Sequence, residues 1–176
     1  MTKLLTTPPP AGAIAAMSCM QGVHIAPTIL VSQRGPDGHL GPEAAGAVLM
    51  LQATFADPLG VERFWAAAVP LMQVLESAPG FIRRYSFPDG PSITLIAFWR
   101  TLADARAFAD RPEHRAAVRD LYKERWQYSH FSALWAIASN HGRTIFCRDC
   151  DGIAAAGSPT CGGCGADLID IYSSDA

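Results

Sequence analysis

Four cysteines near the C-terminus constrain the fold of this chain more than any other feature. They form two C-x2-C pairs separated by ten residues: Cys147, Cys150, Cys161 and Cys164. Gly152 and Gly165 follow the pairs, and glycine permits the tight turn in which backbone amides point at thiolate sulfur. Two such turns supply the four thiolates of a closed tetrahedral site, which is typical of a structural Zn²⁺ ribbon.

A closed four-thiolate site leaves no open position on the metal, so we expect the Zn²⁺ to be structural rather than catalytic. The pattern predicts short ribbon strands over 144–146 and 168–172. A ribbon of about 30 residues buries too little core to fold alone, so metal binding would supply much of its stability. An iron site and a redox dithiol pair remain alternatives. Cys19 is left over as a free or buried thiol.

Composition excludes several classes of partner. The chain has 176 residues, 49% of them hydrophobic and 17% charged, which is enough material for one domain and a small appendage. Its net charge of −2 and the lack of a Lys/Arg block argue against nucleic acid or an anionic membrane as partner. No apolar run approaches the roughly 18 residues of a membrane helix. Prolines 8–10 interrupt any signal-peptide core, and reduced thiolates suit the cytoplasm, so we predict a cytoplasmic protein.

The first 45 residues are rich in Pro, Gly and Ala and lack a sustained period. Within them, Thr28 to Ser32 is a candidate short strand, and Gly35 to Gly38 is a turn signal. We expect this region to be an N-terminal extension, partly irregular.

The pattern changes at residue 46. Apolar content and turn residues predict strands over 47–55, 81–87, 92–100 and 130–139. Helical spacing predicts a first helix over 61–77, and Asp57 to Gly60 is predicted as the turn before it. Thr101 and Asp104 form a capping box that opens a second helix, which restarts at Pro112 and continues to 127. Pro88 to Pro91 is predicted as a hairpin turn.

This order, β-α-β-β-α-β, predicts an α+β fold of the ferredoxin-like type. We divide the chain into an extension (1–45), the ferredoxin-like domain (46–140) and the zinc ribbon (141–176). Helices cover one face of such a sheet. The strands here are apolar on both faces, so we expect a second copy of the chain to cover the other face in a homodimer.

Three segments of the predicted domain resemble a known family. The third strand ends in Ala97 to Arg100, an Ala-rich helix start follows at 105–109, and Arg111 to Arg115 carries a Pro-x-His sequence. These segments resemble the antibiotic-biosynthesis-monooxygenase superfamily of dimeric α+β barrels over roughly residues 46–140. The resemblance implies a homodimer with a pocket between sheet and helices in each subunit. It implies cofactor-free oxygenation of phenols and quinones, haem degradation, or related small-molecule chemistry.

The resemblance selects candidate catalytic residues. His114 is the most family-like polar residue, and its neutral imidazole is suited to act as a base towards an acidic phenol. Gln52 falls near the polar first-strand residue of haem-degrading relatives. Val118 stands where those relatives have their haem ligand, which argues against haem degradation. His114 or His130 remains an alternative axial ligand.

Further residues are candidates for substrate binding because they bring aromatic or imidazole surface to the expected pocket: Phe98, Trp99, Phe108, Tyr122, Trp126, His130 and Trp135. For several of them, core packing or a dimer interface is the competing interpretation. We therefore predict a monooxygenase-like enzyme acting on an aromatic or polyketide-like small molecule. A non-catalytic ligand-binding or interaction protein and a haem enzyme on the same fold are the alternatives.

Overall fold

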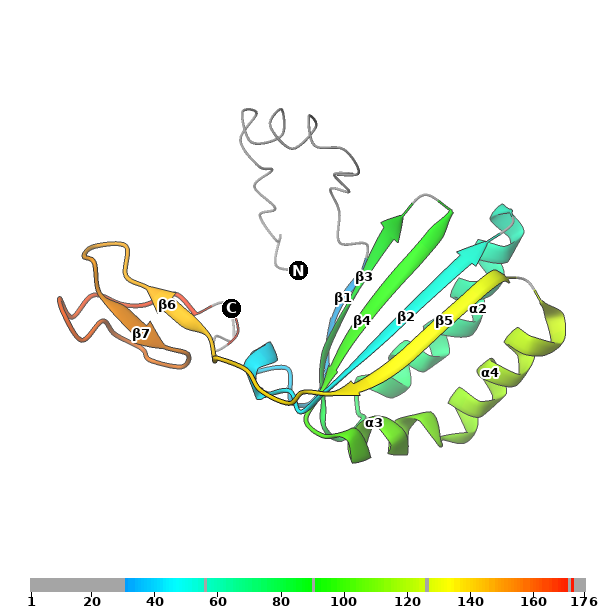
Figure 1. The fold of residues 1–176 in the computed structure, drawn as a ribbon, viewed down its shortest axis with the longest axis horizontal. Coiled ribbons are helices and arrows are strands. Elements are labelled where there is room, and N and C mark those ends of the chain that lie inside the picture. The colour runs from blue at the N-terminus through cyan, green and yellow to red at the C-terminus, as the bar shows by residue number, and fades with distance from the viewer. Residues whose placement is uncertain (1–30, 56, 90, 126, 171, 173–176) are drawn as a thin grey trace, which may run out of the picture.

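The computed structural model describes residues 31–55, 57–89, 91–125, 127–170 and 172. It contains a helix-covered sheet and a separate two-stranded unit that lies beyond the end of the sheet (Figure 1). The predictions for Cys19, Trp126 and the first half of the Thr28 to Ser32 strand fall outside the described residues.

The sheet has the ferredoxin-like order, which confirms the predicted fold class. β2 (Ala47–Phe55) lies between β4 (Ser92–Trp99) and β5 (Gln127–Ala136), and β3 (Phe81–Asp89) lies beyond β4. All of these pairs are antiparallel. β1 (Val31–Arg34) pairs with β3 and adds a fifth strand at that edge.

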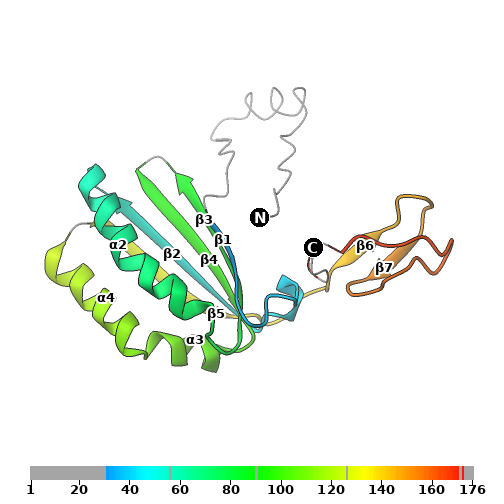
Figure 2. The same ribbon diagram turned by 180° about the vertical axis from the view of Figure 1, so that it is seen from behind.

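Three helices cover one face of the sheet: α2 (Pro58–Leu75), α3 (Leu102–Ala109) and α4 (Pro112–Glu124). They lie in front of the sheet in Figure 2. The predicted capping box is present, since Thr101 Oγ1 accepts a hydrogen bond from the Asp104 amide at 3.1 Å. No helix in the described part of the chain is long and apolar enough to span a membrane.

Two helix boundaries differ from the prediction. The first helix begins at Pro58 rather than 61, because the Asp57 carboxylate caps it by accepting from the Gly60 amide at 2.8 Å. The predicted turn at 57–60 is therefore the first helical turn. α4 ends at Glu124 rather than 127, because Arg125 has a left-handed backbone with φ of 49°.

Two strand boundaries also differ. β5 runs over 127–136 instead of 130–139, because the earlier end of α4 lets the strand start sooner. β3 continues to Asp89, so the hairpin turn is shorter than the predicted 88–91.

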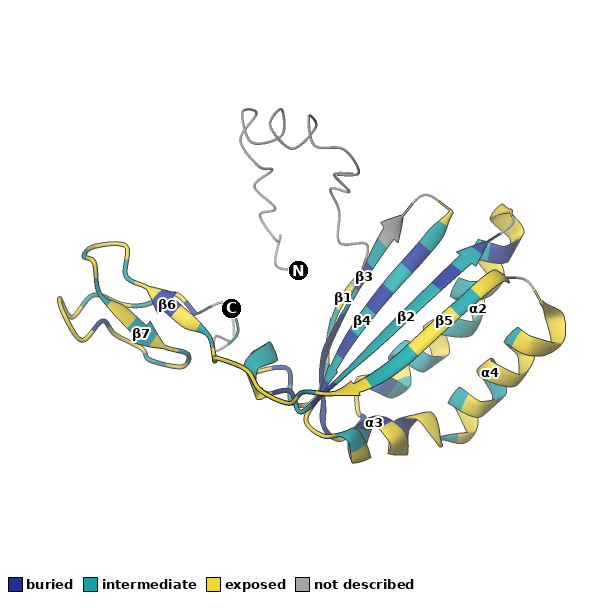
Figure 3. Cartoon of the chain, in the orientation of Figure 1, coloured by how far each residue is buried: buried dark blue, intermediate teal, exposed yellow. Residues whose placement is uncertain are grey.

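Burial alternates along β4, as expected for a strand between two different environments (Figure 3). Trp99, the last residue of β4, is fully buried on the helix-covered side. Its ring centroid lies 5.1 Å from that of Phe81 and 5.4 Å from that of Phe108. This aromatic chain fixes the position of α3 against the sheet.

The other face of the sheet, which we call the open face, is also apolar. By the strand register and alternation, its side chains are Val48, Met50, Tyr85, Phe87, Ile96, Phe98, Phe131 and Trp135. Phe131 and Trp135 are 48% and 47% exposed. No helix of the described chain covers them (Figures 1 and 2).

The two-stranded unit confirms a strand before the first cysteine pair and corrects the second strand. β6 (Thr144–Phe146) pairs with β7 (Ile153–Ala155), which lies between the two cysteine pairs. The predicted strand over 168–172 does not form at its described residues. The Leu168 amide donates to Pro159, and the Asp170 carboxylate accepts from the Gly157 amide, so this segment is held by loop contacts instead.

Candidate substrate cavity and metal centre

A cavity of about 110 Å³ lies between the helix-covered face of the sheet and the helices. Leu49, Leu95 and Trp99 wall it from the sheet, and α2 contributes Phe64 and Ala68. Among the described residues, one side chain from β3 and one from α4 are the only charged or imidazole groups that line it. An apolar wall with a few polar groups is the usual composition of a small-molecule site.

His114 is the α4 residue of this cavity. It lies in the first turn of the helix, and its ring centroid is 5.3 Å from that of Phe108, edge to face. Burial lowers the pKa of His114, while a hydrogen bond to the Ala109 carbonyl partly opposes this. The imidazole is therefore neutral at pH 7. Because one ring nitrogen donates to that carbonyl, the other is left unprotonated as an acceptor.

Arg84 is the β3 residue of the cavity, and it is 4% exposed. Its Nε and Nη2 atoms are buried without a hydrogen-bond partner among the described residues. Desolvation lowers the pKa of Arg84 to about 10, so the guanidinium stays charged at neutral pH. A buried cation without a counterion is costly, and such groups concentrate at functional sites.

The preceding residue, Arg83, has partners for two of its guanidinium nitrogens, although its Nε is also buried without one among the described residues. Arg83 points to the open face, where its Nη2 donates to the Gly38 carbonyl at 2.9 Å and its Nη1 to the Tyr85 hydroxyl at 3.0 Å. Its guanidinium also stacks over the Tyr172 ring, 4.1 Å from the centroid. Arg84 is not among the site residues predicted from the sequence. Two consecutive arginines in a predicted strand must point to opposite faces, and that alternation was the available signal.

The structure separates the two predicted catalytic residues. Gln52 lies on the open face, where its Nε2 donates to Thr94 Oγ1 at 3.5 Å. His114 lies beyond the other face of the sheet. The two side chains therefore cannot contact one molecule within the cavity of one subunit.

The predicted binding residues divide in the same way. Trp99 and Phe108 line the cavity with His114, whereas Phe98 and Trp135 lie on the open face. The structure does not describe Trp126.

The remaining candidates are not among the cavity's lining residues. Tyr122 is 67% exposed. His130 is hydrogen-bonded to Gln127 at 3.2 Å, and burial lowers its pKa. Val118, which the family resemblance places at the haem-ligand position, is exposed on α4.

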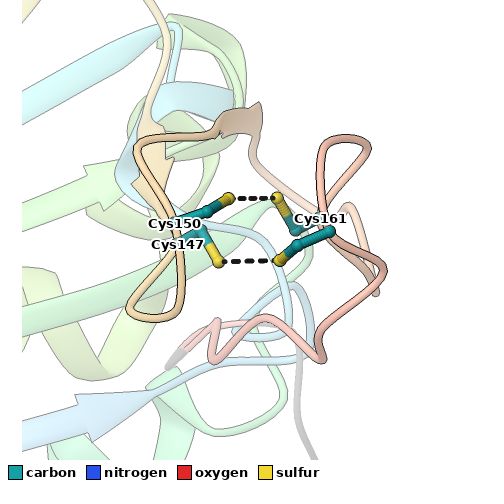
Figure 4. A group of neighbouring side chains, drawn as sticks. Cys147, Cys150 and Cys161 are labelled. Atoms are coloured by element: carbon teal, nitrogen blue, oxygen red, sulfur yellow. Dashed lines mark hydrogen bonds between the residues drawn. The ribbon is translucent and has the colours of Figure 1, made fainter.

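The predicted metal ligands do come together. The Sγ atoms of Cys147 and Cys164 are 3.6 Å apart, as are those of Cys150 and Cys161, and all four lie within 4.8 Å of one another. Figure 4 shows the side chains of the two turns pointing towards each other. Tetrahedral Zn–S bonds of about 2.3 Å place sulfurs about 3.8 Å apart. The four cysteines therefore fit a metal such as zinc.

Backbone amides support the thiolates. The amides of Asp149, Gly152 and Gly163 lie 3.3–3.4 Å from the Sγ atoms of Cys147, Cys150 and Cys161, respectively. The amides of Cys164 and Gly163 lower the pKa of the Cys161 thiol to about 6. A Cβ at Gly152 would lie 2.7 Å from the Cys161 sulfur, which explains the glycine at this position.

The sequence matches no family model and no curated protein. Among solved structures, the chain is similar to a candidate monooxygenase from Fusobacterium nucleatum, with 6% identity and a TM-score of 0.51; the match covers 63% of this chain and 50% of that one.

Two further structures are similar at lower TM-scores. SnoaB, a cofactor-independent oxygenase from Streptomyces nogalater, has 15% identity and a TM-score of 0.45, with 56% of this chain and 100% of that one covered. A candidate antibiotic biosynthesis monooxygenase from Deinococcus radiodurans has 11% identity and a TM-score of 0.46, with 55% and 97% covered. At such identities the similarity concerns the fold alone.

Proposed function

We propose that this protein is an oxygenase that oxidises an electron-rich hydroxylated aromatic in the cavity between sheet and helices. The observation that carries the proposal is the neutral imidazole of His114 in a cavity that also holds the cation of Arg84. A base and a positive charge within apolar walls suit the removal of a proton from a phenol, because the charge stabilises the anion that forms.

The reaction can proceed with the substrate as the only reductant. The unprotonated nitrogen of His114 takes the proton of the substrate hydroxyl, and the electron-rich anion passes an electron to O2. Carbon–oxygen bond formation and loss of water then convert a phenol and one O2 into a quinone and one H2O. The apolar walls hold the substrate and exclude water from the anion.

The other parts of the chain act as support in this proposal. The four cysteines hold a Zn²⁺ that crosslinks the two turns of a ribbon at 141–176, outside the ferredoxin-like domain at 46–140. A second copy of the chain covers the open face, so that two sheets close into a barrel. This assignment rests on the exposed aromatic side chains of Phe131 and Trp135.

Oxygen uptake tests the proposal. The protein should consume O2 with one or more members of a panel of hydroxylated aromatics, and His114→Gln should lower the rate about 100-fold because the base is lost. His141→Gln, which replaces an exposed histidine outside the cavity, should leave the rate unchanged.

The pH dependence adds a second readout. The rate should rise with pH as His114 loses its proton and should level off by neutral pH, because burial places its pKa below the usual ~6.5. An unchanged rate in His114→Gln would eliminate the base. Binding of the panel without any O2 uptake would instead favour the ligand-binding alternative.

A further inference from the structure

Around the cavity, the buried polar atoms that have no hydrogen-bond partner among the described residues include more donors than acceptors. Arg84 contributes Nε and Nη2, and Trp99 contributes Nε1; all three are buried N–H groups without a hydrogen-bond partner among the described residues. Both side chains line the cavity. Buried donors are almost always satisfied in folded proteins, so such a group of unmade bonds indicates a missing acceptor.

The positive charge of Arg84 indicates what kind of acceptor is missing. No described acidic side chain forms an ion pair with Arg84. The five described carboxylates that pair with arginines do so with other arginines: Asp110, Glu113, Glu124, and Glu43 and Asp170, which both pair with Arg143. The guanidinium fork matches a carboxylate with two parallel hydrogen bonds. An anionic acceptor therefore satisfies both the donors and the charge.

The neighbouring strand does not supply an anion. Gln33 of β1 stands directly opposite Arg84 in the register, and its amide nitrogen donates to the Met72 carbonyl at 2.6 Å. Its Oε1 is buried and has no hydrogen-bond partner in the described part of the chain. A neutral amide oxygen could share one N–H of Arg84 but would leave the charge uncompensated.

The size of the cavity limits the ligand. An apolar cavity of about 150 Å³ accepts benzene, whereas sites for drug-sized ligands span about 300–1,000 Å³. At about 110 Å³, the cavity is smaller than the one that accepts benzene, so it excludes fused rings and takes one substituted ring only when neighbouring side chains move. A polyketide-like substrate, which the sequence analysis allowed, would require the helices to move apart.

We propose that the cavity binds a single-ring aromatic acid of the hydroxybenzoate class, with its carboxylate on Arg84 and its hydroxyl at His114. This proposal rests on the proposed function and names the substrate class of the same site. The carboxylate fixes the orientation of the ring, and the hydroxyl then meets the imidazole of His114 in the cavity.

Calorimetry with matched probes tests the proposal. 4-Hydroxybenzoate should bind at least tenfold more tightly than the neutral 4-hydroxybenzamide, and more tightly than the bicyclic 6-hydroxy-2-naphthoate. Arg84→Met should remove the preference for the acid over the amide, and Arg84→Lys should retain part of it because the charge remains without the fork. Equal affinities for acid and amide, or an unchanged preference in Arg84→Met, would overturn the proposal.

Gln33 provides matched variants. Gln33→Glu would place a carboxylate opposite Arg84 and should lower the affinity for 4-hydroxybenzoate at least tenfold, whereas Gln33→Met should change it little. The comparison of acid and amide on the parent protein needs no variant, so it decides the question even if a variant does not fold.

Failure of this proposal can be distinguished from failure of the proposed function. Benzoate lacks the hydroxyl and cannot be oxidised by this route, so its Arg84-dependent binding supports the anion site whether or not O2 is consumed. O2 uptake with neutral phenols and no preference for acids would keep the oxygenase and overturn the anion site.

Discussion

Arg143 and Asp170 form a bidentate ion pair, with Nη1–Oδ1 and Nη2–Oδ2 distances of 2.6 and 2.8 Å. Arg143 also donates to both carboxylate oxygens of Glu43 at 3.2 Å. Its guanidinium and that of Arg83 both stack on the Tyr172 ring. Segments from the start, middle and end of the described chain therefore meet at this point, and together they attach the cysteine-bearing unit to the sheet.

Asp170→Asn should destabilise this junction by about 2 kcal/mol, because the Asp170 side chain is buried and its partner is charged. Thermal unfolding of the zinc-loaded protein at pH 7 measures the effect. Asp110→Asn serves as the control, because it breaks the ion pair of Asp110 with Arg115. That pair is also short, at 2.7 Å, but both side chains are exposed, so its loss should cost less than about 0.5 kcal/mol.

The pH dependence of the same pair has a definite sign. The Arg143 hydrogen bonds hold the pKa of Asp170 well below its usual range, so the folded state binds its proton less readily than the unfolded state. Its stabilisation is fully present above pH about 4 and is lost as the pH falls further. A difference between parent and Asp170→Asn that stays constant from pH 7 to pH 2 would contradict the ion pair.

Metal analysis should give about one zinc per chain, and Cys161→Ser should abolish it, because a four-thiolate site does not tolerate loss of a buried ligand. Amide exchange should then increase in β6 and β7 and remain slow in β2 and β4, which have their own core. Cys19→Ser serves as the control and should keep the metal. Zinc-free parent protein that retains slow exchange in β6 would contradict the structural role.

Trp135→Glu should convert a dimer to a monomer, because it places a charge on the open face next to Val48. Ser132→Glu lies on the same strand but on the opposite side of the sheet, where it is exposed, and should leave the dimer intact. Sedimentation at micromolar concentration distinguishes the two states. A monomeric parent would show that the open face is not covered by a second copy.

Much of the fold could be predicted from local patterns. Thr101 and Asp104 form the predicted cap, and β4 (Ser92–Trp99) lies within the strand predicted over 92–100. The missed boundaries depend on single residues, such as the cap at Asp57 and the left-handed Arg125, whose conformations are selected by tertiary context. β1 was only partly predicted, since its pairing with β3 is a long-range contact.

The metal ligands were predictable because four thiolates at this spacing have few alternative uses. The cavity was harder to predict because the family resemblance concerned the fold. It placed Gln52 and His114 in one site, although the sheet lies between them. Arg84 was missed because strand alternation gives the face of a residue but does not show that its Nε and Nη2 find no acceptor among the described residues.

The measurement that tests the central claim most directly is O2 uptake after the cavity is filled. Ala68 of α2 lines the cavity, and Ala66 lies exposed on the same helix. With a substrate that the parent oxidises, Ala68→Phe should reduce uptake at least tenfold because its ring occupies the space of the substrate, while Ala66→Phe should match the parent. Equal uptake by both folded variants would contradict the assignment of this cavity as the active site.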